Sequence, residues 1–275
     1  MSRNQDRFGG PLQSDTTPPQ GGGFSFVVPT EFVELPSRGK YYPPTHPLHG
    51  QTTLEFKQMT AKEEDILTSR ALLKKGIVLE RVMESVIVDK TIQPSQMFVG
   101  DRNALVIALR AAAYGRMYNT EVTCPNCQHK QSHSFDLVQK KLTGFEHDEQ
   151  IVDNGDSTFN VITPFTKVDV RFKLLIGEDE RNILQGLEMD KKQEVEKNIS
   201  RHLSTMLVSV NGFSDARSIN LYVQGAPASE ARFIRECYKK VNPDVDLTQE
   251  FTCSECGHER SMEVPLSVDF FWPNG

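Results

Sequence analysis

Four of the five cysteines form two Cys-x-x-Cys pairs, Cys124 with Cys127 and Cys253 with Cys256, and a long stretch of chain separates the pairs. A gap of two residues lets one tight turn present both sulfurs to the same ion. Four thiolates complete a closed tetrahedral zinc site. We therefore predict that the two pairs meet in space and bind one structural Zn²⁺.

The two pairs have similar surroundings. The pattern Thr-Cys-x-x-Cys-x-His-x-x-Ser begins at Thr123 and again at Thr252. A short extended run precedes each pair and an alternating run follows it, which predicts a β-hairpin with the cysteines at its turn. Two hairpins that share one ion form a zinc ribbon.

Other interpretations of the cysteines remain open. A redox pair of the thioredoxin type needs its motif at the start of a helix in a βαβ unit, whereas both pairs here lie between predicted strands. Catalytic zinc is disfavoured because four sulfurs leave no position for water. His129 or His258 could replace a cysteine as ligand, and the cysteines could also be unrelated buried or oxidised residues. We interpret Cys237, the odd cysteine, as a small buried apolar residue.

The rest of the chain predicts an α+β fold with a helical N-terminal part and an α/β insertion between the two halves of the ribbon. Residues 1–29 are rich in Gly, Pro, Gln, Ser and Thr and predict a flexible arm. Residues 30–120 predict an extended, proline-interrupted segment followed by a helical region. The ribbon halves are residues 121–145 and 246–272, and an α/β insertion spans residues 146–245.

Start and stop signals define the helical region. After a predicted strand at 53–57, Thr60 and Glu63 form a capping box that opens a helix over 61–75, which ends at Gly76. Asp101 is expected to cap a later helix. Between them, a helix is predicted to place three valines on one face: Val78, Val82 and Val86.

In the insertion, alternation predicts a strand over 167–174. Helices are expected at 178–187, from about Asp190 to Val210 with His202 in the core, and after Pro227 with Ser229 as cap.

Composition limits the possible functions. The chain has 275 residues and a net charge of −6 without a basic block, which disfavours binding to a phosphate backbone. No apolar run approaches the ~20 residues that span a bilayer, and no signal peptide is recognisable. Thiols in this pattern suggest synthesis in a reducing cytoplasm. Because the nucleotide-binding, hydrolase and metalloprotease motifs are missing, we expect no enzymatic activity and no small-molecule substrate.

Several segments resemble the T4-type bacteriophage baseplate protein family: Phe32-Val33-Glu34-Leu35-Pro36-Ser37-x-Gly39, His46-Pro47-Leu48-x-Gly50, 59–67, 99–104 and Phe270-Phe271-Trp272-Pro273. These are proteins of contractile phage tails associated with the baseplate hub. The resemblance implies a virion protein, made in the host cytoplasm, that catalyses nothing and contacts other baseplate, hub, tail-tube or wedge proteins.

Seven residues from the segment 32–50 and from the C-terminal aromatics are the expected partner contacts: Phe32, Leu35, Tyr41, Tyr42, Phe270, Phe271 and Trp272. Two rival functions remain. One is a transient hub assembly chaperone that is absent from the mature virion, and the other is a nucleic-acid-binding zinc-ribbon protein.

Overall fold

Helices and small antiparallel sheets are mixed along the chain in the computed structural model, which confirms the α+β class. The structure describes residues 27–138, 140–144, 146, 148–192, 198–264 and 268–271. The arm expected at residues 1–29 lies, up to residue 26, outside the described residues.

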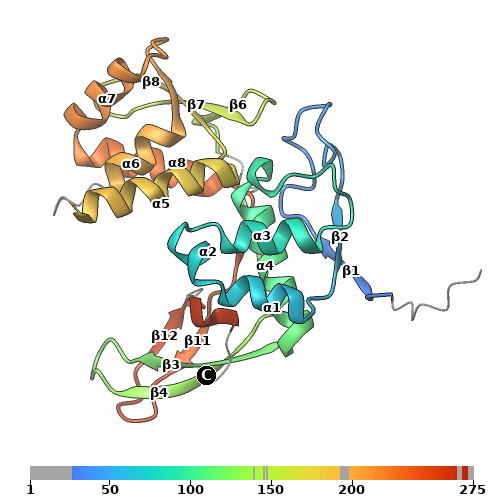
Figure 1. Cartoon of the computed structure of the whole chain (residues 1–275). Helices are drawn as coiled ribbons and strands as arrows, with labels where there is room; N and C mark the ends of the chain where they lie inside the picture. Colours follow the sequence, from blue (N-terminus) through green and yellow to red (C-terminus); the bar gives the residue numbers. More distant parts are fainter. Residues whose placement is uncertain are drawn as a thin grey trace, which may run out of the picture.

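The helices form two groups along the chain (Figure 1). The N-terminal group consists of α1 (Ala61–Thr68), α2 (Arg70–Lys74), α3 (Val78–Val86) and α4 (Val99–Tyr114). The second group consists of α5 (Gly177–Lys192), α6 (Asn198–Met206), α7 (Ala216–Gly225) and α8 (Ala228–Val241). None of the described helices combines the length and apolarity that a bilayer crossing requires.

The strands pair in small sheets. Three of these are two-stranded hairpins: β1 (Thr30–Glu34) with β2 (Thr53–Lys57), β3 (Met117–Thr123) with β4 (Lys130–Asp136), and β11 (Gln249–Thr252) with β12 (Glu259–Met262). Between the cysteine pairs, one sheet runs in the order β6 (Ile151–Asp153), β7 (Thr158–Ile162), β8 (Asp169–Lys173) and β9 (Leu207–Val210). All its neighbours are antiparallel.

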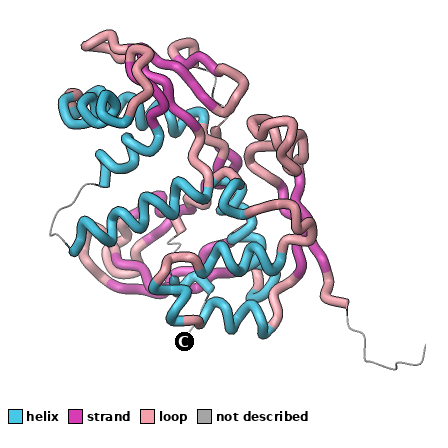
Figure 2. The backbone as a smooth tube through the Cα atoms, turned by 45° about the horizontal axis from the view of Figure 1, so that its top comes forward, coloured by secondary structure: helices cyan, strands magenta, loops and turns pink. Residues whose placement is uncertain are grey.

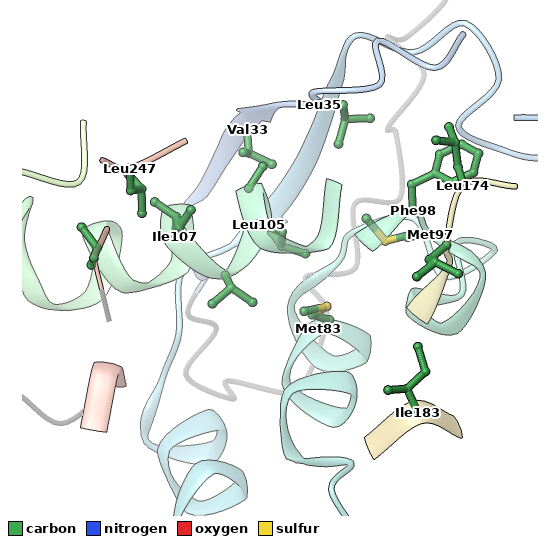
Figure 3. Close-up of a cluster of buried hydrophobic side chains, with 14 of the residues drawn as sticks. Val33, Leu35, Met83, Met97, Phe98, Leu105, Ile107, Leu174, Ile183 and Leu247 are labelled. Carbon is green, nitrogen blue, oxygen red and sulfur yellow. The ribbon is translucent and has the colours of Figure 1, made fainter. Parts of the chain in front are cut away.

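Helix α4 lies in the middle of the molecule (Figure 1), and side chains on most of its faces are buried. Leu105 and Ile107 pack with residues from β1, from α3 and from the segment before β11 (Figure 3). The same core reaches Leu174 and Ile183 of the insertion (Figure 3). One hydrophobic core therefore joins the N-terminal region to the insertion.

The first turn of α4 contacts the proline-interrupted segment through Asp101. Asp101 does not cap the helix as expected, because the helix begins two residues earlier, after Phe98. The Asp101 carboxylate is fully buried and accepts hydrogen bonds from the Ser37 amide (2.9 Å), the Ser37 hydroxyl (2.6 Å) and the Tyr42 hydroxyl (2.8 Å). Asp101 thus holds the proline-interrupted segment against α4.

A short ladder at the base of the insertion brings its two ends together. Strand β5 (Lys141–Thr143) pairs with β10 (Asp244–Asp246) in the register Thr143 to Asp244. The ladder is held to α4, because Asn103 donates a 3.1 Å hydrogen bond to Asp244. Gly100 also lies so close that an added Cβ would be 1.9 Å from the Pro243 carbonyl oxygen. The chain therefore leaves the first hairpin and returns to the second at neighbouring points.

Three of the expected helices differ in the structure. The helix expected at 61–75 is divided at Ser69, which ends α1 and begins α2. The backbone of Ser69 is extended (φ −65°, ψ 104°), and serine is a residue type that favours helix caps. The helix expected from about Asp190 to Val210 is shorter at both ends: Asp190 belongs to α5, which runs on to Lys192, and α6 ends at Met206 because Leu207–Val210 pairs with β8. His202 is exposed rather than in the core. Pro227, not Ser229, occupies the cap position of α8.

Candidate metal centre

Each cysteine pair lies in a tight turn at the tip of its hairpin. In the first turn the Cys124 amide donates to the His129 carbonyl (2.8 Å) and the Gln128 amide donates to the Cys124 carbonyl (2.9 Å). The second turn repeats both hydrogen bonds: the Cys253 amide donates to the His258 carbonyl (2.9 Å), and the Gly257 amide donates to the Cys253 carbonyl (3.0 Å). Because the residue after the second cysteine has a positive φ in both turns, 62° at Gln128 and 67° at Gly257, the two turns have the same backbone shape.

The four sulfurs meet between the two hairpins. The Sγ atoms of Cys124 and Cys256 are 3.8 Å apart, those of Cys127 and Cys253 are 3.6 Å apart, and all four lie within 4.8 Å of one another. A regular tetrahedron with Zn–S bonds of about 2.3 Å separates its sulfurs by about 3.8 Å. The donor set and its spacing fit a tetrahedral metal ion.

Two of the alternative interpretations do not agree with this geometry. A disulfide needs an S–S distance of about 2.05 Å, well below the distances between the pairs, and all five cysteines are free. His129 and His258 are not members of the four-cysteine group. Instead, their backbone carbonyls close the two turns.

Glutamine side chains join the hairpins to each other. Gln131 on β4 donates to the Thr252 carbonyl (3.1 Å), and its Oε1 accepts from the Ser254 amide (2.8 Å). At the other end of the hairpins, Gln249 accepts from the Asp136 amide (3.0 Å) and donates to the Asp136 carbonyl (2.8 Å). The sequence did not predict this role for Gln131 and Gln249, because nothing in their spacing distinguishes them from other surface glutamines.

Beneath the cysteines, the hairpins share an aromatic cluster. Phe135 and Phe251 are fully buried, and the His133 ring contacts both edge-to-face at centroid distances of 4.6 and 5.4 Å. Edge-to-face pairs of this kind add about 0.5–1.5 kcal/mol to the burial of the rings. The two hairpins therefore also meet through an apolar contact of their own.

The thiol pKa values in the cluster differ widely. Hydrogen bonds from the Asn126 side chain and the His258 backbone lower the pKa of Cys256 to about 6. The His129 backbone lowers the pKa of Cys127, but desolvation and hydrogen bonds with the other three cysteines outweigh it and raise that pKa to about 12. A cation between the sulfurs would favour deprotonation of all four, because thiolates are the metal-binding form.

The residues expected to contact partners are mostly inside the molecule. Leu35, Tyr41, Tyr42, Phe270 and Phe271 are 7% exposed or less. Trp272 lies outside the described residues. Of the six that the structure describes, only Phe32, at 67% exposure, presents its side chain to solvent. Phe32 therefore stays a candidate contact, and Trp272 stays a prediction.

Phe270 and Phe271 are buried because they pack under α4. Phe270 lies in a short 3₁₀ helix (Val268–Phe271), and its ring is 5.1 Å from that of Tyr118. The Phe270 carbonyl accepts a 2.7 Å hydrogen bond from Nε of the fully buried Arg110. This segment therefore closes the core below the first hairpin.

Comparisons with known proteins give one match. The model of the family described as "T4 bacteriophage base plate protein" matches residues 28–272 of the chain. No curated protein and no solved structure matches it.

Proposed function

Because the chain belongs to the T4 bacteriophage base plate protein family, we propose that it is a structural subunit of the contractile-tail baseplate. In this proposal it lies in the hub region, acts through protein contacts and catalyses no reaction. The observation that carries the proposal is the extent of the family match, from residue 28 to residue 272.

Three buried carboxylates hydrogen-bond to other segments of the fold, which supports a structural role. Asp101 binds the segment around Ser37 and Tyr42. Glu63 accepts from Thr60 (2.9 Å to its amide) and from the Ser85 hydroxyl (2.5 Å), and so ties α1 to α3. Glu230 accepts from the Thr166 amide (2.6 Å) and hydroxyl (2.7 Å), which joins α8 to the loop before β8. Each of these acids is engaged in holding the fold together.

The proposal includes a structural Zn²⁺ held by Cys124, Cys127, Cys253 and Cys256, with the two hairpins as a zinc ribbon. The sulfur distances of 3.6 and 3.8 Å support it, as does the repeated turn geometry. A structural zinc contributes on the order of 10 kcal/mol of apparent binding free energy to folding. Two short hairpins from distant parts of the chain would be fixed to each other by one ion.

The surface of the ribbon disfavours the nucleic-acid rival. Residues 117–136 and 249–264 contain six carboxylates, Glu121, Asp136, Glu250, Glu255, Glu259 and Glu263, against two basic side chains, Lys130 and Arg260. Lys130 is moreover paired with Glu121 at 3.1 Å. Four thiolates around Zn²⁺ would add further negative charge. Such a surface repels a phosphate backbone.

Location in the virion distinguishes a permanent subunit from the assembly chaperone. Mass spectrometry of purified tails tests this directly, since a chaperone would leave before maturation.

A further inference from the structure

An apolar groove of about 470 Å³ lies between α7 and the β8–β9 edge of the insertion. Its lining includes Val168 just before β8, Val210 of β9 and Phe213 from the turn after β9. Helix α7 and its end contribute Leu221, Tyr222 and Ala226. Helix α7 packs on β9 without filling this space.

Large apolar side chains around the groove face solvent. Leu221 is 74% exposed and Phe213 is 63% exposed, and both line the groove. Phe165, on the neighbouring loop between β7 and β8, is 71% exposed. Soluble proteins seldom leave apolar side chains clustered in this way unless something binds there.

The groove offers almost no charge to an occupant. Glu230 is the one charged residue in its lining, and that side chain is fully buried. Both of its oxygens accept hydrogen bonds from Thr166. A matching occupant would be apolar and uncharged.

A segment of that chemistry leads into β1. No charged residue occurs between Asp15 and Glu31, and the last part of this stretch reads Phe24-Ser25-Phe26-Val27-Val28. Val27, the first residue that the structure describes, is 82% exposed, and Phe32 in β1 is 67% exposed. Val27 and Phe32 therefore present a second apolar surface.

The two surfaces cannot meet within one chain. Figures 1 and 2 show the start of β1 and the α7 end of the insertion on opposite sides of the molecule. Phe24 precedes Val27 by three residues in the sequence, and three residues of chain span at most about 11 Å. The groove that this segment can reach belongs to another molecule.

We propose that Phe24–Val28 of one copy occupies the apolar groove of a second copy, between its α7 and β9. Such a contact is heterologous, so repetition builds a ring when the rotation closes and an open chain when it does not. The inference stands apart from the proposed function, since it rests on these two surfaces alone.

The test is a complementation experiment on the full chain by sedimentation velocity over a series of concentrations. One variant, Phe24→Ser with Phe26→Ser, removes the anchors and keeps the groove. A second, Leu221→Asp, blocks the groove and keeps the anchors. Leu184→Asp is the matched control, because Leu184 is also exposed (49%) but lies on α5, outside the groove lining.

The wild type and the Leu184→Asp control should self-associate as concentration rises. Each of the other variants should weaken association by at least about tenfold, because a few apolar anchors dominate such contacts. A mixture of the two should form a one-to-one dimer that grows no further.

Three results would overturn the proposal. They are a wild type that stays monomeric throughout, an anchor variant that associates like wild type, and a mixture that shows no dimer. A photo-crosslinker at position 26 that reacts within its own chain, or only with a different tail protein, would also reject the second copy as occupant.

Discussion

The Ser37 hydroxyl donates a 2.6 Å hydrogen bond to Oδ2 of Asp101, sixty-four residues further along the chain. Ser37 lies in the proline-interrupted segment and Asp101 in the first turn of α4, and both belong to segments that carry the family likeness. This contact joins two segments that are distant in the sequence.

Replacing Asp101 with Asn should destabilise the protein by about 2–4 kcal/mol, because an amide places a donor against the hydroxyl and amide donors that surround this buried site. Urea denaturation measures the change. Asp215→Asn is the control: Asp215 caps α7 from an exposed position, where Asn caps equally well, so its stability should stay near wild type. Equal losses in both variants would contradict the role given to Asp101.

Replacing Gly100 with Ala should be strongly destabilising, by about 3 kcal/mol or more, since the new Cβ would overlap the Pro243 carbonyl. Gly225→Ala, at the end of α7, meets nothing within 4 Å and should be neutral or slightly stabilising. Thermal melting of the two variants compares them. If Gly100→Ala melts like wild type, α4 and β10 are not in contact.

Removing the metal ligands should release the ribbon. We expect one zinc per chain by metal analysis, and we expect that Cys124→Ser with Cys253→Ser loses both the zinc and the protection of β3–β4 and β11–β12 in hydrogen exchange. Cys237→Ala is the matched control, because this buried thiol is on α8 and should leave the zinc content unchanged. A double variant that exchanges like wild type would show that the site is not structural.

The pH dependence of stability should contain a contribution from Glu63. Burial would raise its pKa, but hydrogen bonds from Ser85 and Thr60 outweigh burial and lower it. A carboxyl group with a lowered pKa stabilises the fold above its unfolded pKa of about 4.3, and this contribution is lost as the pH falls through the folded pKa.

Glu63→Gln should therefore cost about 1 kcal/mol at pH 7, and the difference from wild type should shrink below about pH 4. Denaturation of both proteins at pH 7 and pH 3.5 measures it. Zinc loss at low pH is common to both proteins, so it cancels in the comparison. A difference that stays constant with pH would refute the assignment.

Purified tails should contain the protein in fixed proportion to other baseplate subunits. Mass spectrometry of mature particles gives this proportion, and particles stalled in assembly serve as the comparison. Presence only in the stalled particles would favour the chaperone.

Much of the four-cysteine cluster was predictable from sequence, because a Cys-x-x-Cys pair defines its turn locally. The spacing alone indicated which four residues would meet, and the repeated flanking residues indicated two hairpins. Short-range signals also predicted the capping box at Thr60 and Glu63, the valine face of α3 and the strand at β2. Each depends on residues within a few positions of one another.

Long-range pairing decided the rest. Leu207–Val210 continues a helical pattern in the sequence. It forms β9 instead, because its backbone pairs with the free side of β8. Asp101 resembles a helix cap, but Ser37 and Tyr42 determine its role from outside the helix. Leu35, Tyr42 and Phe270 resemble contact residues until the tertiary structure buries them. Local sequence determined the four cysteines and the turns that hold them. The β5–β10 ladder, which joins residues about a hundred positions apart, decided where those turns meet.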